Sequence, residues 1–310
     1  MLAYYSKRSQ GEEFEELKKP LKSGMWVSGS NLTVEEINQL IKDYDLAANI
    51  VYDVRDHQEL PRTEAHLDDL YVFLRLPHLA KSGHVVTAPL LAVVRPDTLI
   101  SLTQFDSLSL DVIKRVTLPI TTTKTDELLL GIIAACVEAY VDLLHHTERS
   151  INDTANRLRT HEVNNQDFIH FVVVEDNLTS YRMNLGGIHT VVERLRSGSY
   201  SVIDESMNES LDDISLQLKQ LLVAVESYKG RVESIRNAYS TIANNKLNQR
   251  MKTLTVLTVL ITLPNVFYGM YGMNIALPYA DAPWAYGAVV GFTVALMLIV
   301  YVVAKRFKIF

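Results

Sequence analysis

The sequence predicts a mixed α/β domain at the N-terminus, followed by one long stalk helix and two transmembrane helices at the C-terminus. Three observations support this fold class. Short runs rich in β-branched residues, broken by Pro, Asp and Gly, fill residues 1–120. Long helical patterns replace them from residue 125 onward. Two charge-free apolar stretches, 253–280 and 282–304, close the chain, and each is long enough to cross a bilayer.

The N-terminal part is expected to be a layered α/β domain, because strand and helix patterns alternate along it. A short strand is predicted at 25–27, and a helix at 33–45 with Asn31 or Thr33 as its N-cap. Further β-rich runs are predicted at 48–54, 68–77, 85–103 and 112–119.

Three long helices are predicted after this domain. The first two cover residues 126–159 and 166–198. The third begins near Ser206 and meets no proline before Pro264, so it would be roughly 60 residues and about 90 Å long. The predicted division of the chain is a cytoplasmic α/β domain with two long helices at 1–205, the stalk and first transmembrane helix at 206–271, a loop at 272–283, and the second transmembrane helix with a basic tail at 284–310.

The placement of basic residues predicts the membrane topology. Lys and Arg flank the two spans on the side of the chain termini, and the loop between the spans has neither. These residues are Arg250, Lys252, Lys305, Arg306 and Lys308. Basic residues mark the cytoplasmic side, so both termini are expected in the cytoplasm and the protein in the cytoplasmic membrane. The first 19 residues lack the apolar core of a signal peptide.

Charge and composition exclude several functions. Residues 1–249 carry 25 Lys and Arg against 35 Asp and Glu, which argues against nucleic acid as a partner and fits attraction of cations. Cys136 is the one cysteine, so neither a disulfide nor a thiolate metal cluster is expected. The phosphate-binding pattern GxxxxGK[ST] does not occur, so any transport by this chain is expected to be passive and no organic cofactor is expected.

The first apolar stretch carries a polar row. Its members are spaced three or four residues apart and therefore share one helix face. They are Thr255, Thr258, Thr262 and Asn265. The same spacing continues back through Met251, Asn248, Asn244, Thr241, Asn237, Ser234, Gly230, Ser227, Val223, Gln220 and Leu216 to Asp213. A heptad seam of this kind implies several helices around a shared axis. Small polar residues allow either close helix packing or a water-filled axis, and the repeated asparagines favour the pore.

The motif that ends this helix is Tyr271-Gly272-Met273-Asn274. Together with the two-span hairpin, the preceding long helix, the MK-LT pattern at Met251–Thr255, Pro264 and the basic tail, it resembles the CorA family of divalent-cation transporters. The segment LPRTEAHLDDLYVFLRL also resembles the N-terminal domain of that family.

The resemblance implies a homopentamer shaped as a funnel, in which the first spans line a pore for hydrated Mg²⁺, with Co²⁺ and Ni²⁺ as further candidate ions. Gly272, Met273 and Asn274 would form the selectivity filter at the outer mouth. The implied pore-lining residues below it are Asn265, Thr262, Thr258, Thr255, Leu254, Met251 and Asn248, with Leu254 or Met251 as an apolar gate. Family members often have Met at the position of Thr262, so this upper pore is expected to be more hydrophilic.

The resemblance also implies inhibition by cytoplasmic Mg²⁺ bound between protomers. Asp213 matches the position of one family carboxylate and Asp212 is its neighbour. Their partner carboxylate would come from the adjacent α/β domain, and Asp97 and Asp106 are the two candidates for it. Without the resemblance, the simplest interpretation is that these two acids near a helix start interact favourably with the helix dipole.

Two other functions stay open from the sequence. A Zn²⁺, Co²⁺ or Ni²⁺ transporter of the same fold is one, although all nine histidines precede residue 190 and none lies in the spans or their loop. The other is a membrane-tethered cytoplasmic sensor or enzyme, for which His145 and His146 offer no convincing site. We expect no enzymatic activity.

Overall fold

The computed structural model describes residues 1–21, 23–104, 120–160, 165–198, 207–273 and 282–306, together with single positions 113, 116, 118, 200, 204 and 279. The chain forms two compact units, Met1–Ser234 and Ile235–Phe310. The long helix α6 (Asn208–Tyr271) contributes to both. Each unit is described by itself below. The predicted four-part division of the chain stays a prediction.

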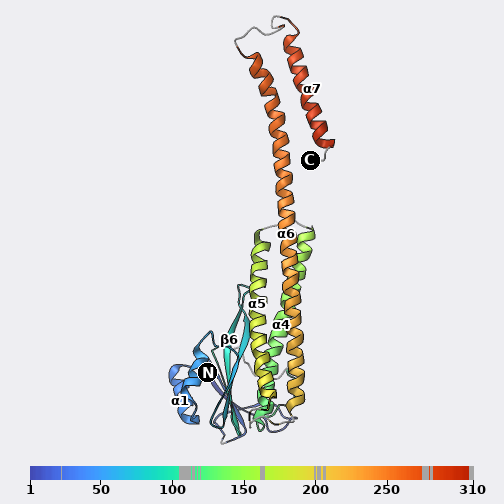
Figure 1. Cartoon of the computed structure of the whole chain (residues 1–310). Helices are drawn as coiled ribbons and strands as arrows, with labels where there is room; N and C mark the ends of the chain where they lie inside the picture. Colours follow the sequence, from blue (N-terminus) through green and yellow to red (C-terminus); the bar gives the residue numbers. More distant parts are fainter. Residues whose placement is uncertain are drawn as a thin grey trace. The chain divides into compact units, whose positions relative to one another are not determined.

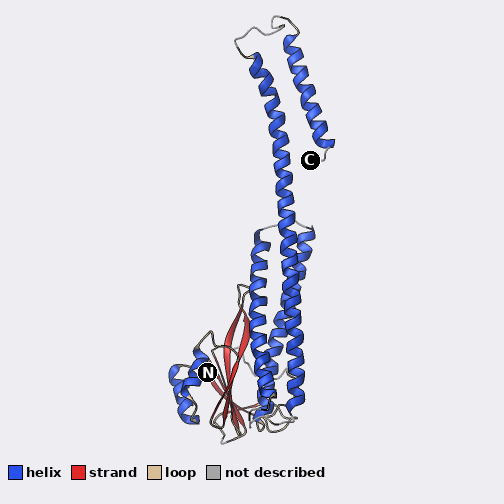
Figure 2. Cartoon of the chain, viewed as in Figure 1, coloured by secondary structure: helices blue, strands red, loops and turns tan. Residues whose placement is uncertain are grey.

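The N-terminal unit contains a seven-stranded sheet with the order β2-β1-β3-β7-β6-β5-β4. Its strands are β1 (Leu2–Ser6), β2 (Glu15–Leu17), β3 (Met25–Ser30), β4 (Arg62–His66), β5 (Asp69–Leu79), β6 (Val85–Val94) and β7 (Thr98–Thr103). Only β3 and β7 pair in parallel, and the other neighbours are antiparallel. The predicted α/β fold class, with its long helix and C-terminal apolar helix, is confirmed (Figure 2).

Helices cover both faces of the sheet (Figure 1). The helices α1 (Val34–Tyr44) and α2 (Ala48–Tyr52) pack on one face, against alternate residues such as Leu91 and Val93. The intervening residues Leu90 and Ala92 are also fully buried. Side chains alternate along a strand, so these two belong to the other face of the sheet, where α4 (Thr125–Thr160) and α5 (Asn165–Arg196) lie. Burial on both faces explains the long apolar runs of β5 and β6, and β7 is buried along its whole length as well.

The helix α1 begins as the sequence indicates, and the structure selects its cap. The Thr33 hydroxyl accepts a hydrogen bond from the Glu36 N–H, and the Glu36 carboxylate accepts one from the Thr33 N–H. This reciprocal pair is a capping box, which satisfies two of the amide groups left free at a helix start. Thr33, not Asn31, is therefore the N-cap.

The β-rich run predicted at 48–54 was wrong. It forms α2 and the short 3₁₀ helix η1 (Asp53–Arg55). Ile50, Val51 and Val54 are buried in the core, with the three- and four-residue spacing of a helix face. Packing under the sheet therefore overrides the strand preference of β-branched residues. The strands β1 and β2 were not predicted, and most of the run at 112–119 lies outside the described residues.

Burial separates a core helix from the candidate membrane spans. Among the described residues, three helices are long and apolar enough to cross a membrane: α4, α6 and α7 (Ala285–Arg306). In α4, 61% of an apolar stretch of 18 residues is buried inside the protein, whereas the buried share of the corresponding stretch is 6% in α6 and 11% in α7. Cys136 and Tyr140 of α4 donate hydrogen bonds to the Arg75 carbonyl at 3.1 and 3.0 Å, which fixes α4 on the sheet. Of these three helices, α6 and α7 therefore expose the apolar surface suited to lipid.

Two adjacent glycines in α5 provide a test of this packing. A Cβ added at Gly187 would lie 2.8 Å from Pro61 Cγ, whereas one added at Gly186 would meet nothing within 4 Å. Both alanine variants gain helix propensity, but only Gly187→Ala overpacks the contact with the proline ring. We expect Gly187→Ala to be less stable than Gly186→Ala by about 1–3 kcal/mol. Denaturant unfolding of the detergent-solubilised protein, followed by circular dichroism, measures this difference. Equal stabilities would contradict the packing of α5 on Pro61.

Candidate functional site

Within the C-terminal unit, one face of α6 packs toward α7. Phe267 contacts Phe292 of α7 edge-on, with ring centroids 5.3 Å apart. Val256 lies on the same face, because its position differs from that of Phe267 by three helical turns. It is the most buried side chain of this segment of α6, and Thr293 and Ala304 are the buried positions of α7. This apolar contact fixes which side of α6 remains uncovered by α7.

The predicted polar row lies on the uncovered side. At 100° per residue, its centre is roughly 150° around the helix from the Val256–Phe267 line. The row members in the apolar stretch are exposed: Thr255, Thr258, Thr262 and Asn265. Met251 and Leu254, the two residues implied as a gate, are also exposed, as is Asn248 one turn before them. The structure therefore brings all seven predicted pore residues onto one broad face that this chain leaves uncovered.

The threonine hydroxyls of the row are oriented by their own helix. Each donates its hydrogen to a backbone carbonyl one turn earlier: Thr255 to Met251 at 2.9 Å, Thr258 to Leu254 at 2.8 Å and Thr262 to Thr258 at 2.6 Å. A hydroxyl has one hydrogen to donate and two lone pairs that accept. The lone pairs of these three hydroxyl oxygens therefore remain, and they can only accept hydrogen bonds from an outside ligand.

The glycine of the terminal motif is close to the helix backbone. The Gly272 N–H donates to the Tyr268 carbonyl at 2.9 Å, and a Cβ at this position would lie 3.3 Å from that oxygen. A side chain at this position would therefore crowd the Tyr268 carbonyl, and the backbone of Gly272 is not left-handed. Met273 is exposed, and its N–H donates a hydrogen bond to the Met270 carbonyl at 3.3 Å. Asn274 lies outside the described residues.

The two acids implied in regulation differ in their surroundings. Both are exposed near the start of α6, and Asp212 accepts a hydrogen bond from the Arg196 guanidinium at 2.7 Å. Asp97 lies in the turn between β6 and β7, and Asp106 lies outside the described residues. In the described part of the chain, no group of three His, Cys, Asp or Glu residues could hold a metal ion. A complete ligand set for Asp213 would thus need residues from elsewhere, such as a second copy.

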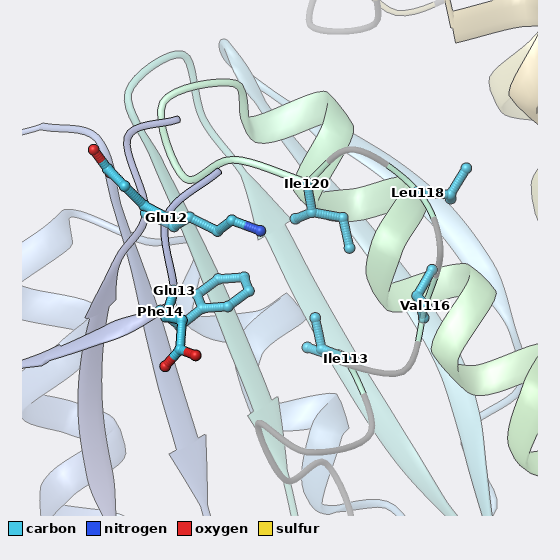
Figure 3. Close-up of a pocket in the computed structure, with 8 residues that line it drawn as sticks. Glu12, Glu13, Phe14, Ile113, Val116, Leu118 and Ile120 are labelled. Carbon is cyan, nitrogen blue, oxygen red and sulfur yellow. The ribbon is translucent and has the colours of Figure 1, made fainter. Parts of the chain in front are cut away.

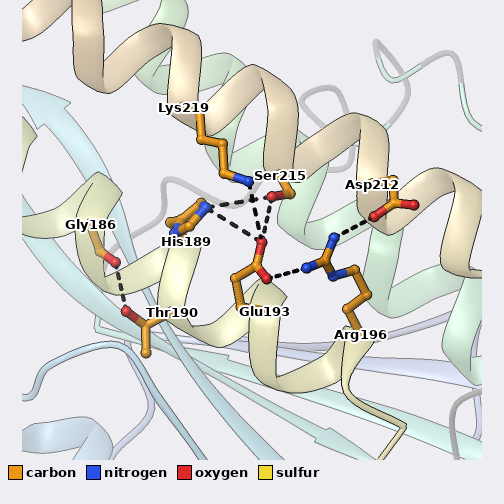
Figure 4. A network of polar contacts seen from close by, with 8 residues as sticks. All are labelled: Gly186, His189, Thr190, Glu193, Arg196, Asp212, Ser215 and Lys219. Carbon is orange, nitrogen blue, oxygen red and sulfur yellow. Dashed lines mark hydrogen bonds and ion pairs between the residues drawn. The ribbon is translucent and has the colours of Figure 1, made fainter.

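A polar network missed by the sequence analysis joins α5 to α6 beside these acids (Figure 4). The Glu193 carboxylate accepts hydrogen bonds from Ser215 at 2.7 Å and from Arg196 at 2.6 Å, and Lys219 lies 3.8 Å away. The Ser215 hydrogen bond, followed by the charges of Arg196, Lys219 and His189, lowers the pKa of Glu193. The spacing of His189, Glu193 and Arg196 on one face of α5 could have indicated a polar contact, but not its partner.

A cavity of about 270 Å³ in the N-terminal unit lies apart from these groups (Figure 3). Phe14, Ile113 and Ile120 border it, and the Lys7 ammonium lies 5.1 Å from the centre of the Phe14 ring. None of the predicted site residues lines this cavity.

Comparisons with known proteins match almost the whole chain. The family model described as "CorA-like Mg2+ transporter protein" matches residues 22–306. The "Cobalt/magnesium transport protein CorA" of Methanocaldococcus jannaschii is 21% identical over 291 residues, which cover 91% of this chain and 90% of that protein. The protein of the same name from Thermotoga maritima is 23% identical over 196 residues, covering 59% of this chain and 53% of its own length.

A solved structure shows the same fold. The complete structure of the CorA magnesium transporter from Methanocaldococcus jannaschii superposes with a TM-score of 0.83 at 18% identity, covering 99% of this chain and 98% of that one.

Proposed function

The chain belongs to the CorA-like Mg²⁺ transporter family, a family of membrane transporters for divalent cations, and on this premise we propose that it forms a passive channel for hydrated Mg²⁺. The ion would move down its electrochemical gradient into the cytoplasm. A membrane potential of 100 mV supplies ~4.6 kcal/mol for a divalent ion, twice the value for one elementary charge.

The observation that carries this proposal is the uncovered polar row of α6. Its threonines lie in a stretch whose composition suits a bilayer, on the face opposite the contact with α7. Polar side chains are costly against lipid unless they face a protein interior or water. A shared aqueous axis would remove this cost, because the polar faces of all copies would meet there and contact water.

The part of α6 in the N-terminal unit supports assembly of several copies. One side of it carries the fully buried residues Leu211, Leu218 and Val225. Hydrogen bonds from Ser215 to Glu193 of α5 and from Gln217 to Glu138 of α4 join this part of α6 to the neighbouring helices. The opposite side exposes Leu216 and Val223, at 56% and 71%, in the same three- and four-residue spacing as the polar row. Exposed apolar residues in a heptad pattern favour contact with another helix of the same kind. We propose that the protein is a homopentamer, as the family resemblance implies.

The proposed route begins at the filter formed by Gly272, Met273 and Asn274. Neutral amide and carbonyl oxygens suit Mg²⁺, which releases its water shell reluctantly, because they bind coordinated water without holding the ion tightly. Below the filter the ion passes Asn265 and the three threonines. Leu254 or Met251 forms the apolar gate, and Asn248 follows it toward the cytoplasm. Both termini are proposed to be cytoplasmic.

Water access to introduced cysteines tests this proposal. The native thiol gives little background, because Cys136 is fully buried and burial raises its pKa to about 12. We expect Thr262→Cys and Thr258→Cys to react with a charged methanethiosulfonate reagent in membrane vesicles and to lose Mg²⁺ flux on modification. Leu257→Cys, on a side of α6 away from the row, is the matched control and should not be modified. Protection of both row positions from the reagent would exclude a wet axis and favour a membrane tether.

A further inference from the structure

We propose that Thr255, Thr258 and Thr262 act as a ladder of hydrogen-bond acceptors that determines the charge selectivity of the pore. The ladder would pass cations that keep their water shell and reject anions, with no carboxylate in the spanning segment. This inference rests on the proposed pore and names residues within it that set specificity.

The structure provides the acceptor character directly. All three hydroxyl hydrogens are donated inside the helix, to carbonyls one turn earlier, at 2.9, 2.8 and 2.6 Å. The donor of each hydroxyl is therefore satisfied, while its lone pairs remain. All three residues are exposed on the face away from α7, so the remaining lone pairs are available to whatever occupies the axis.

This chemistry matches a hydrated cation. Water bound to a metal ion through its oxygen presents hydrogens outward, and those hydrogens need acceptors. A chloride or phosphate ion instead needs donors or positive charge. Residues 253–280 contain no Lys, Arg or His, and the three threonines of the ladder have no hydroxyl hydrogen left to donate. The same stretch has no Asp or Glu, so binding stays weak enough for release.

The spacing also fits stepwise passage. Thr258 and Thr262 are four residues apart, which corresponds to ~6 Å along the helix axis, and Thr255 lies a further ~4.5 Å below. A hydrated ion that leaves one set of acceptors thus meets the next within one turn. Several weak sites in series are what conduction requires. Asn265, at the outer end, differs because its amide offers donors as well as acceptors.

The chain contains a matched control for the hydrogen bond itself. Thr253 also donates to a carbonyl one turn earlier, that of Gln249 at 3.0 Å, but it lies on the other side of α6 from the row. A threonine that only satisfies its hydroxyl within an apolar helix should behave like Thr253. A threonine of the ladder should differ from it.

The experiment compares purified variants in liposomes loaded with a Mg²⁺-sensitive or a chloride-sensitive dye. We expect the double variant Thr258→Val/Thr262→Val, which keeps the side-chain shape and removes both acceptors, to lower Mg²⁺ flux at least tenfold. The double serine variant at the same positions keeps both acceptors and should recover most of the flux that the double valine variant loses. The control Thr253→Val should remain within about twofold of the unmodified protein. Thr262→Asn keeps the position polar but adds donors, and it should raise chloride flux at least severalfold.

The outcomes separate this inference from the proposed function. An unmodified protein without Mg²⁺ flux would refute the channel. An unmodified protein that conducts, beside a double valine variant that conducts equally, would overturn the ladder alone. Unchanged chloride rejection in a conducting Thr262→Asn variant would overturn the role of the missing donors. Size-exclusion profiles that match the unmodified protein confirm that each variant assembles.

Discussion

Replacement of Asn274 by alanine is expected to abolish selective Mg²⁺ uptake, with a fall of at least tenfold in flux. The residue ends the motif that follows α6, and it brings the one side-chain amide of the proposed filter. In an oligomer every copy loses its amide at once, so a ring of oxygens that bind the ion's water shell disappears. A tenfold change corresponds to ~1.4 kcal/mol, about the net value of one hydrogen bond.

Flux into liposomes with a Mg²⁺-sensitive dye measures this effect. Asn245→Ala is the matched control, because Asn245 is an exposed asparagine of α6 that lies off the polar row. It should conduct like the unmodified protein. Both variants should elute from size exclusion at the same volume as the unmodified protein. Normal Mg²⁺ flux and selectivity in Asn274→Ala would remove this residue from the filter.

Replacement of Asp213 by alanine is expected to weaken inhibition by internal Mg²⁺, with the half-inhibiting concentration raised roughly tenfold. Asp213 is exposed at the start of α6, the helix that continues without interruption into the first span. We propose that its carboxylate holds a regulatory Mg²⁺ together with groups from a neighbouring copy. Mg²⁺ prefers oxygen ligands and often binds only one or two carboxylates. Removal of one carboxylate therefore removes a large part of the ligand set.

Asp212→Ala provides the comparison, because Asp212 is the second proposed regulatory acid but is already paired with Arg196 at 2.7 Å. If both acids hold the ion, both variants should shift the inhibition curve, and Asp213→Ala should shift it further. Patch recordings or flux assays with internal Mg²⁺ varied give the curve. A curve for Asp213→Ala that coincides with that of the unmodified protein would place the sensor elsewhere.

The α/β domain illustrates how far local sequence signals reach. A cap at Asn31 or Thr33 and the β-rich runs that became β5, β6 and β7 could be predicted, because capping residues and strand preference are local properties. The run 48–54 could not, since its β-branched residues became helical on packing beneath the sheet. The contact between Glu193 of α5 and Ser215 of α6 was equally hidden, because it joins residues far apart in the chain.

The sequence by itself determined the fold class, the two spans and the polar row, because all three follow from the periodicity of apolar and polar residues along one helix or strand. It also determined the family, through the motif at Tyr271–Asn274 and the hairpin that surrounds it. Only the tertiary structure decided that apolar α4 is a core helix, because composition alone does not reveal what covers a surface. It likewise decided which face of α6 meets α7 and where the threonine hydroxyls donate, since both depend on contacts in space.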